Sequence, residues 1–165
     1  MKPTKLYKID YNSPLGLMRL LADDNALIGS YFKGQAYFEH GYEELEFRQE
    51  MNASLTLAVD WLDAYFAGEM AEQPLLAPRG TPFQLKVWQA LQTIPTGQTV
   101  TYGQLAQQLQ CRSARAIGGA VGKNPLSLFI PCHRVVGKGG LLTGYAGGLD
   151  KKIWLLNHEA NLTSH

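Results

Sequence analysis

Residues 101–122 read TYGQLAQQLQCRSARAIGGAVG and contain two helix starts separated by a short turn. Thr101 can cap the first helix, and Gln104 at the third helical position would complete a capping box. Ser113 can cap a second helix, which we expect to run from residue 114 to about residue 122. Two short helices joined in this way predict a helix-turn-helix.

The second of these helices consists mostly of small residues. Its large polar side chain is Arg115, and its small residues are Ala114, Ala116, Gly118, Gly119 and Ala120. Two adjacent glycines cost a helix about 1 kcal/mol each relative to alanine. A helix face without large side chains allows either tight helix packing or close approach to DNA. Close approach to DNA explains the cost of the two glycines better. Such a helix could enter the minor groove, which is about 6 Å wide.

Charge is distributed unevenly along the 165 residues. The formal net charge is +1, but residues 1–78 contain 6 Lys and Arg against 12 Asp and Glu, whereas residues 79–165 contain 9 against 2. This asymmetry is expected when only the second half approaches nucleic acid. We predict an N-terminal α/β domain in residues 1–78 and a C-terminal domain in residues 79–165, connected through the proline-containing segment 71–79.

The N-terminal half combines strand patterns with one helix. Alternating or apolar segments at 6–11, 15–22 and 26–32 are separated by polar turns and predict an antiparallel set of strands. Asn52 suits the start of an amphipathic helix, and Gly68 suits its end. The predicted fold class is therefore α/β, with a small strand-plus-helix domain followed by a mainly helical domain.

Two further helices are predicted in the C-terminal half. Thr81 with Pro82 and Gln84 forms a capping-box start for a helix to about residue 91. Asp150 can cap a final helix to about residue 160, from which Glu159 could reach the centre of the domain. We expect the inward-facing residues of this last helix to include Ile153, Leu156 and Ala160.

A thiol and an imidazole are adjacent in Pro131-Cys132-His133, directly after the apolar run 126–130. A thiolate is the nucleophilic form of cysteine, and a neighbouring imidazole can take the thiol proton. Adjacent side chains on a strand point to opposite faces, so contact needs a turn or a bridging water, of which we favour the water. The alternative for such a pair is a buried cysteine beside a hydrogen-bonded core histidine.

Several motifs accompany this pair at characteristic spacings. They are RGTPFQ at 79–84, VW at 87–88, IP at 94–95, YGQLA at 102–106, ARA at 114–116, NP at 124–125, PCHRV at 131–135, GYAGG at 144–148 and WLLNHE at 154–159. Together they resemble the O6-alkylguanine-DNA alkyltransferase family over roughly half of the chain. The first half shows no comparable signature. The resemblance implies a winged-helix-like helix-turn-helix and single-turnover alkyl transfer from DNA to a cysteine.

The resemblance also implies a role for each residue of a catalytic site. Cys132 would be the alkyl acceptor, His133 the base that reaches it through water, and Glu159 the group that orients the histidine. Tyr102 would protonate the leaving guanine, which is a role suited to a phenol. Asn124 would brace the pocket.

Contacts with DNA follow from the same resemblance. The alkylated base must rotate out of the duplex before a thiol can reach it, and Arg115 would then fill the gap in the base stack. The residues implied on the DNA-facing surface, besides Arg115, are Tyr102, Ala114, Ala116, Gly118 and Gly119. Those implied around the flipped base are Val135, Tyr145, Ala146 and Gly147.

The expected partner is double-stranded DNA containing O6-alkylguanine, bound through its minor groove by a monomer. We expect no cofactor and no metal; His40 is the only Cys or His in residues 1–78, so the zinc site that some relatives carry there should be absent. No apolar run approaches the roughly 20 residues of a membrane span, and no signal-peptide core follows the first five residues. With two cysteines and no C-x-x-C pair, a cytoplasmic location is expected.

Two other functions compete with this interpretation. One is a protein that binds and marks alkylated bases without reacting, although such family members lack the cysteine. The other is a cysteine hydrolase that uses Cys132, His133 and Glu159 on an acyl substrate. The turn at 110–113 also lacks the glycine and proline common in the family, which leaves its geometry open and leaves Cys111 as either a second reactive thiol or a packing residue.

Overall fold

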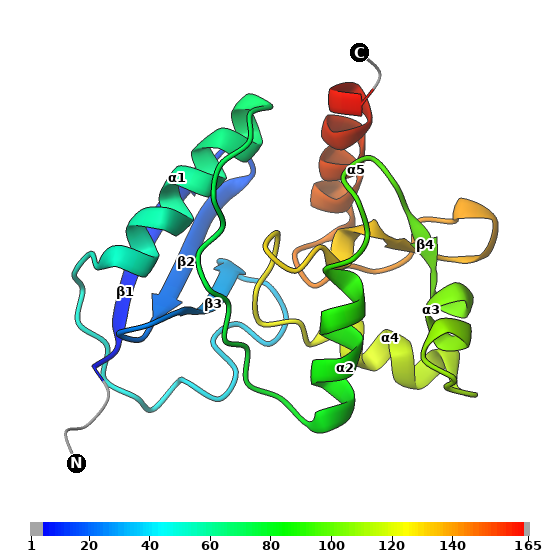
Figure 1. Cartoon of the computed structure of the whole chain (residues 1–165), viewed down its shortest axis with the longest axis horizontal. Helices are drawn as coiled ribbons and strands as arrows, with labels where there is room; N and C mark the ends of the chain where they lie inside the picture. Colours follow the sequence, from blue (N-terminus) through cyan, green and yellow to red (C-terminus); the bar gives the residue numbers. More distant parts are fainter. Residues whose placement is uncertain (1–4, 164–165) are drawn as a thin grey trace. The chain divides into compact units, whose positions relative to one another are not determined.

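The computed structural model describes residues 5–163 of the chain, which divides into two compact units, Met1–Arg79 and Gly80–His165. Figure 1 shows the elements of each unit. The predicted division, between residues 78 and 79, lies one residue earlier. Residues 1–4, part of the stretch considered for a signal peptide, lie outside the described residues. Within residues 5–163, no helix combines the length and apolar character needed to cross a membrane.

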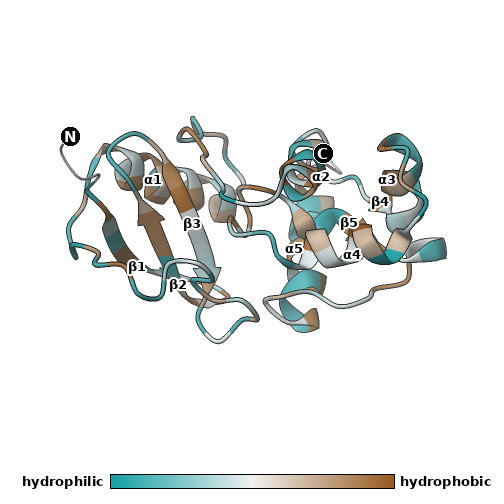
Figure 2. Cartoon of the chain, turned by 90° about the horizontal axis from the view of Figure 1, so that it is seen from below, coloured by the Kyte–Doolittle hydropathy of each residue, from teal (hydrophilic) through white to brown (hydrophobic). Residues whose placement is uncertain are grey.

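An antiparallel sheet and one helix form the first unit. Strands β1 (Tyr7–Ser13), β2 (Gly16–Ala22) and β3 (Leu27–Phe32) pair in the order β1-β2-β3, which confirms the predicted strand set. All of β3 is buried, and the sheet includes the hydrophobic stretches drawn brown in Figure 2. Helix α1 (Ala53–Ala67) packs against all three strands and closes the core of this unit.

Both ends of α1 follow the local chemistry of the sequence. The Asn52 side chain accepts a hydrogen bond from the backbone N–H of Leu55, and Gly68 adopts the left-handed conformation that ends the helix. Asn52 also donates to the backbone oxygen of Asp23 at 2.9 Å. The cap residue therefore joins the start of α1 to the turn between β2 and β3.

Helices predominate in the second unit, where α2 and α3 both pack against α4. Two very short strands, β4 and β5, pair in parallel, with Val100 opposite Val135. The elements in chain order are α2 (Pro82–Leu91), β4 (Val100–Thr101), α3 (Tyr102–Gln108), α4 (Ala114–Gly122), the 3₁₀ turn η1 (Cys132–Arg134), β5 (Val135–Val136), the 3₁₀ turn η2 (Lys138–Gly140) and α5 (Leu149–Thr163). Helices α3 and α4 are the predicted helix-turn-helix.

Side-chain caps define where three of these helices begin. Complete capping boxes start α2, at Thr81, and α3, at Thr101, and the Ser113 hydroxyl caps α4. The buried indole of Trp88 on α2 donates to the backbone oxygen of Ala120 at 2.8 Å. This bond fixes α4 against α2 and leaves the opposite face of α4 uncovered by that helix.

The turn between α3 and α4 is a Schellman motif without glycine. The N–H of Cys111 bonds to the oxygen of Ala106 at 2.8 Å, and the N–H of Gln110 bonds to the oxygen of Gln107 at 3.1 Å. Gln110 occupies the left-handed position with φ 54°, which costs a non-glycine residue about 1–2 kcal/mol. The thiol of Cys111 is half-buried and donates to the backbone oxygen of Ser113 at 3.5 Å.

The predicted inward face of α5 is wrong. The helix begins at Leu149, so Asp150 lies in its first turn and is not its cap. Ile153 and Ala160 are exposed and Leu156 is half-buried. The residues that are fully buried on α5 are Lys152, Leu155 and Glu159. The apolar pattern misled the assignment because two charged side chains occupy the buried face.

Candidate active site

Cys132 begins the 3₁₀ turn η1 at the centre of the second unit. Its backbone N–H donates to the oxygen of Ile130 at 2.8 Å, so the chain turns here instead of continuing as a strand. Cys132 is 5% exposed, whereas His133 is fully buried. The thiol thus has narrow access to solvent, and the imidazole has none.

A strained, fully buried segment leads into this turn. Residues 124–131 are all buried, and Leu128 has φ 75°, a conformation that non-glycine residues adopt only when their surroundings enforce it. The amide of Asn124 provides that enforcement: its oxygen accepts from the N–H of Leu126 at 2.9 Å, and its nitrogen donates to the oxygen of Ile130 at 2.8 Å. Asn124 therefore holds both ends of the segment that presents Cys132.

Glu159 is the hub of the buried polar network beside the thiol. Its carboxylate accepts from Nε2 of His133 at 2.6 Å and from Nε and Nη2 of Arg134 at 2.7 and 3.0 Å. Arg134 also donates to the oxygen of Ile94 at 2.6 Å and to the hydroxyl of Thr96 at 3.1 Å. Both carboxylate oxygens are therefore engaged, and the imidazole ring is held in one orientation.

The Glu159 bond also sets the tautomer of His133. Because Nε2 donates to a carboxylate, this nitrogen carries the ring proton and Nδ1 is left as an acceptor. Among residues 5–163, no protein atom lies within hydrogen-bonding distance of this buried Nδ1. A proton acceptor is consequently available on the residue next to the thiol.

Burial dominates the charge states of these groups. Burial raises the pKa of the Cys132 thiol, and a side-chain hydrogen bond with Asn124, the charge of Lys152 and a hydrogen bond with Tyr145 only partly oppose it. Burial also lowers the pKa of His133 against the opposing effect of Glu159. Burial raises the pKa of Glu159, but hydrogen bonds and charges of His133 and Arg134 outweigh it and hold that pKa well below its usual range. The resting pair is a neutral thiol and a neutral imidazole.

Lys152 lies near enough to the thiol to interact with it electrostatically and has no carboxylate partner among the described residues. Its side chain is fully buried, and Nζ donates to the backbone oxygens of Thr143 and Gly144 at 3.2 and 3.5 Å. Burial lowers the pKa of Lys152, and the nearby Cys132 opposes this effect. A thiolate formed at Cys132 would therefore be stabilised by this charge.

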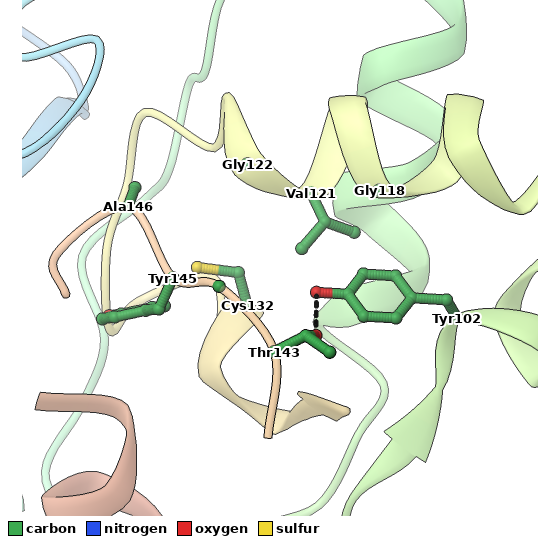
Figure 3. A pocket seen from close by; sticks show the side chains of 9 residues that line it. Tyr102, Gly118, Val121, Gly122, Cys132, Thr143, Tyr145 and Ala146 are labelled. Carbon is green, nitrogen blue, oxygen red and sulfur yellow. Dashed lines mark hydrogen bonds between the residues drawn. The ribbon is translucent and has the colours of Figure 1, made fainter. Parts of the chain in front are cut away.

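A cavity of about 320 Å³ opens at the thiol. Figure 3 shows side chains that line it. Its volume is at the lower end of the range of small-molecule sites, about 300–1,000 Å³. The lining residues are Tyr102, Gly118, Val121, Gly122, Cys132, Thr143, Gly144, Tyr145 and Ala146. Of the residues expected around the base, Tyr145 and Ala146 are in this lining. Val135, fully buried in β5, and Gly147 are not.

The exposed face of α4 adjoins this cavity. Ala114, Arg115 and Ala116 are exposed in the first turn of the helix. A Cβ atom added at the exposed Gly119 would meet no atom within 4 Å, whereas one added at Gly118 would lie 3.8 Å from the Tyr102 ring. The bare helix face and the tyrosine thus form a continuous surface that leads to the cavity.

Comparison with known proteins accounts for both units. Residues 82–161 match the family described as 6-O-methylguanine DNA methyltransferase, DNA binding domain, and residues 6–74 match its ribonuclease-like domain. The chain belongs to the 6-O-methylguanine DNA methyltransferase family. The match over residues 6–74 was not evident from the motifs, which lie between residues 79 and 159.

Individual members of this methyltransferase family resemble the chain along most of its length. The methylated-DNA–protein-cysteine methyltransferase of Salmonella typhimurium is 50% identical over 129 residues, which are 76% of this chain and 72% of the relative. The protein of that name from Mycolicibacterium paratuberculosis is 44% identical over 152 residues, or 90% and 88% of the two chains. The crystal structure of Mycobacterium tuberculosis OGT in complex with DNA is 39% identical, with a TM-score of 0.84 and 94% of each chain covered.

Several residues of the site were not predicted from the sequence, and they include Val121, Gly122 and Gly144 of the cavity lining. Arg134 and Lys152 are charged yet buried, and Thr143 lines the cavity. Arg134 lies inside the PCHRV motif and could have been suspected from that position. Nothing in the local sequence distinguishes Lys152 from the exposed lysines of this methyltransferase. No three His, Cys, Asp or Glu side chains within residues 5–163 are grouped as metal ligands would be.

Proposed function

We propose that the protein repairs duplex DNA by transferring the alkyl group of O6-alkylguanine irreversibly to its own Cys132. The observation that carries the proposal is a thiol in a cavity of about 320 Å³ that is also lined by the phenol of Tyr102 and by glycines of α4. The Salmonella and Mycolicibacterium relatives are named methylated-DNA–protein-cysteine methyltransferases, which supports methyl transfer from DNA to a cysteine. The C-terminal half, residues 79–165, would carry both DNA binding and alkyl transfer.

Helix α4 would enter the minor groove of the DNA. Its exposed alanines and Gly119 leave room for close approach, and the formal charge of residues 79–165, nine basic against two acidic residues, favours the phosphate backbone. The M. tuberculosis OGT was crystallised with DNA, which supports DNA as the partner of this chain. Arg115 is exposed at the start of α4, where it could occupy the space left by a flipped nucleotide. We propose that one monomer suffices.

Activation of the thiol would use the tautomer of His133. A water between Sγ of Cys132 and the free Nδ1 would pass the thiol proton to the ring, since buried polar atoms are normally bridged in this way. Glu159 would balance the charge that forms on the imidazole, and Lys152 would stabilise the thiolate. Glu159 and Lys152 would thereby offset the free-energy cost of forming a buried thiolate and imidazolium during the reaction.

The transfer itself is a displacement at the alkyl carbon. The thiolate sulfur forms a bond to this carbon as the bond from the carbon to O6 breaks, and the electron pair of that bond remains with the guanine. Tyr102 gives its phenolic proton to the ring, so that guanine leaves as a neutral base. Tyr102 then regains a proton as His133 releases the one it took, and the net change is the thiol proton moved to guanine. Cys132 ends as a thioether.

Such a thioether has no hydrolytic route in this site, so each protein would act once. This distinguishes the proposal from a cysteine hydrolase, whose acyl-enzyme must be released. The chemistry requires neither a cofactor nor a metal ion. Because the nucleophile must stay reduced, we propose a cytoplasmic location.

Loss of the lesion from the DNA tests the proposal. A duplex carrying one O6-methylguanine is mixed with increasing amounts of protein, and its nucleosides are then measured. We expect one O6-methylguanine to become guanine for each protein added, and a Cys132→Ala variant to bind the duplex without converting it. Tight binding without conversion by the natural protein would favour a marker of alkylated bases instead.

A further inference from the structure

Two hydroxyl groups meet at one wall of the cavity. Oγ1 of Thr143 donates a hydrogen bond to Oη of Tyr102 at 3.4 Å, drawn as the dashed line in Figure 3. Tyr102 begins α3, whereas Thr143 lies in the segment before α5, 41 residues further along the chain. The bond therefore joins two separate parts of the site at the phenol that faces the bound base in the proposed reaction.

Neighbouring groups restrict the orientation of Thr143. Lys152 donates to its backbone oxygen at 3.2 Å. A Cβ atom added to Gly137 would lie 3.2 Å from Cγ2 of Thr143, so the threonine methyl group packs directly against this glycine. A β-branched side chain has few χ1 rotamers. With its methyl group against Gly137, the hydroxyl group is directed toward Tyr102.

Once Tyr102 has given its proton away, its oxygen can only accept, so Thr143 is then the donor of this bond. A phenol has one proton, so a phenol oxygen that accepts from Thr143 is free to donate its own proton elsewhere. When Tyr102 protonates the leaving guanine, negative charge develops on Oη, and a hydrogen bond to a charged oxygen is stronger than one to a neutral oxygen. The bond would therefore be stronger in the transition state than at rest.

We infer that Thr143 is a positioning residue for alkyl transfer, which directs the Tyr102 proton into the cavity and stabilises the phenolate that forms. The inference rests on the proposed function. The separation of 3.4 Å exceeds that of a relaxed O–H···O bond, about 2.7–2.8 Å. Catalytic hydrogen bonds are often long before the substrate is bound and shorten when it arrives.

The competing explanation is that Thr143 only packs the wall of the cavity. A packing role would depend on the shape of the side chain, whereas the inferred role depends on its hydroxyl group and on Tyr102. Thr143→Val preserves the shape and removes the hydroxyl, and Thr143→Ser preserves the hydroxyl and removes the methyl. Tyr102→Phe removes the group through which Thr143 is inferred to act.

The experiment measures single-turnover methyl transfer from an O6-methylguanine duplex over a range of protein concentrations, which separates DNA binding from the chemical step. We expect Thr143→Val to slow the chemical step about 10- to 100-fold with DNA affinity unchanged. Thr143→Ser should stay close to the natural rate. In a Tyr102→Phe background, Thr143→Val should have no further effect. Thr56→Val, on the exposed face of α1, is the matched control and should react normally.

An equal slowing by Thr143→Val with and without the Tyr102 hydroxyl would overturn the inference and indicate packing. An unchanged rate in Thr143→Val would overturn it as well. Melting curves identify a variant that does not fold, in which case Thr143→Ala takes its place in the same cycle. Absence of methyl transfer by the natural protein would refute the proposed function itself, and with it this inference.

Discussion

Replacing Arg134 by methionine tests the buried network that holds His133. The guanidinium group makes four hydrogen bonds, two to Glu159, one to the oxygen of Ile94 and one to Thr96. Methionine fills similar space but provides none of them. Glu159 would then remain buried and charged with the neutral His133 as its partner, and the oxygen of Ile94 would lose this donor.

The size of the effect follows from the burial of the pair. Removing one partner of a buried ion pair costs about 3–5 kcal/mol, because the other charge is left uncompensated. For a chain of 150–250 residues, 1 kcal/mol corresponds to about 2–4 °C in melting temperature. Arg134→Met should therefore melt about 6–20 °C below the natural protein. Arg134→Lys keeps the charge but not the planar fork, so an intermediate loss is expected.

Thermal unfolding followed by fluorescence is a suitable assay, since the buried Trp88 belongs to the same unit as Arg134. Methyl transfer should also slow, because Arg134 would no longer hold the Glu159 carboxylate in position against Nε2 of His133. An Arg134→Met protein as stable as the natural one would refute the view that this network holds the site together. A lysine variant equal to the natural protein would show that charge alone is sufficient.

Three further predictions concern acid stability, DNA docking and the helix-turn-helix. The pKa of Glu159 is lowered in the folded state, so its ionised form stabilises the fold above about pH 4.3, the ordinary glutamate value, and this contribution is lost as the pH falls through the lowered pKa. Urea titrations of the natural protein and of Glu159→Gln should therefore give unfolding free energies that differ strongly at pH 7 and less in acid. A difference that does not change with pH would contradict this. Gly119→Leu should fold normally, since the space beside Gly119 is open. It should lose most of its DNA affinity, measured by fluorescence anisotropy, while still reacting with a free O6-alkylguanine base. Full DNA affinity would exclude docking through this face of α4. Gln110→Gly should raise stability by about 0.5–1 kcal/mol in thermal melts, because Gln110 has φ 54°; a lower melting temperature would mean that the glutamine side chain has a stabilising contact.

Local chemistry explains which parts of the fold were predictable. Helix starts at Asn52, Thr81, Thr101 and Ser113 follow from side chains that cap the backbone within three residues. These interactions do not depend on the rest of the protein, so sequence spacing is sufficient to find them. The antiparallel strands of the first unit follow similarly from alternation and polar turns.

Parts of the site that depend on distant residues could not be predicted. Leu128 adopts a left-handed conformation because Asn124 and the buried surroundings enforce it, and a leucine by itself indicates nothing of the kind. Lys152 is buried by neighbours that fold over it, although lysine is usually exposed. On α5, Glu159 was expected to point inward and does, but Ile153 and Ala160 were expected there in place of Lys152 and Leu155. Long-range packing, rather than propensity, decided each case.

The mass of the intact protein shows whether Cys132 accepts the alkyl group. The protein is mixed with an equimolar duplex carrying one O6-methylguanine, weighed by mass spectrometry and mapped by peptide digestion, with Cys132→Ala and Cys111→Ala as parallel samples. We expect a gain of one methylene group on Cys132, which stops at one equivalent, persists in Cys111→Ala and is absent in Cys132→Ala. An unchanged mass, or a methyl group on Cys111, would contradict it.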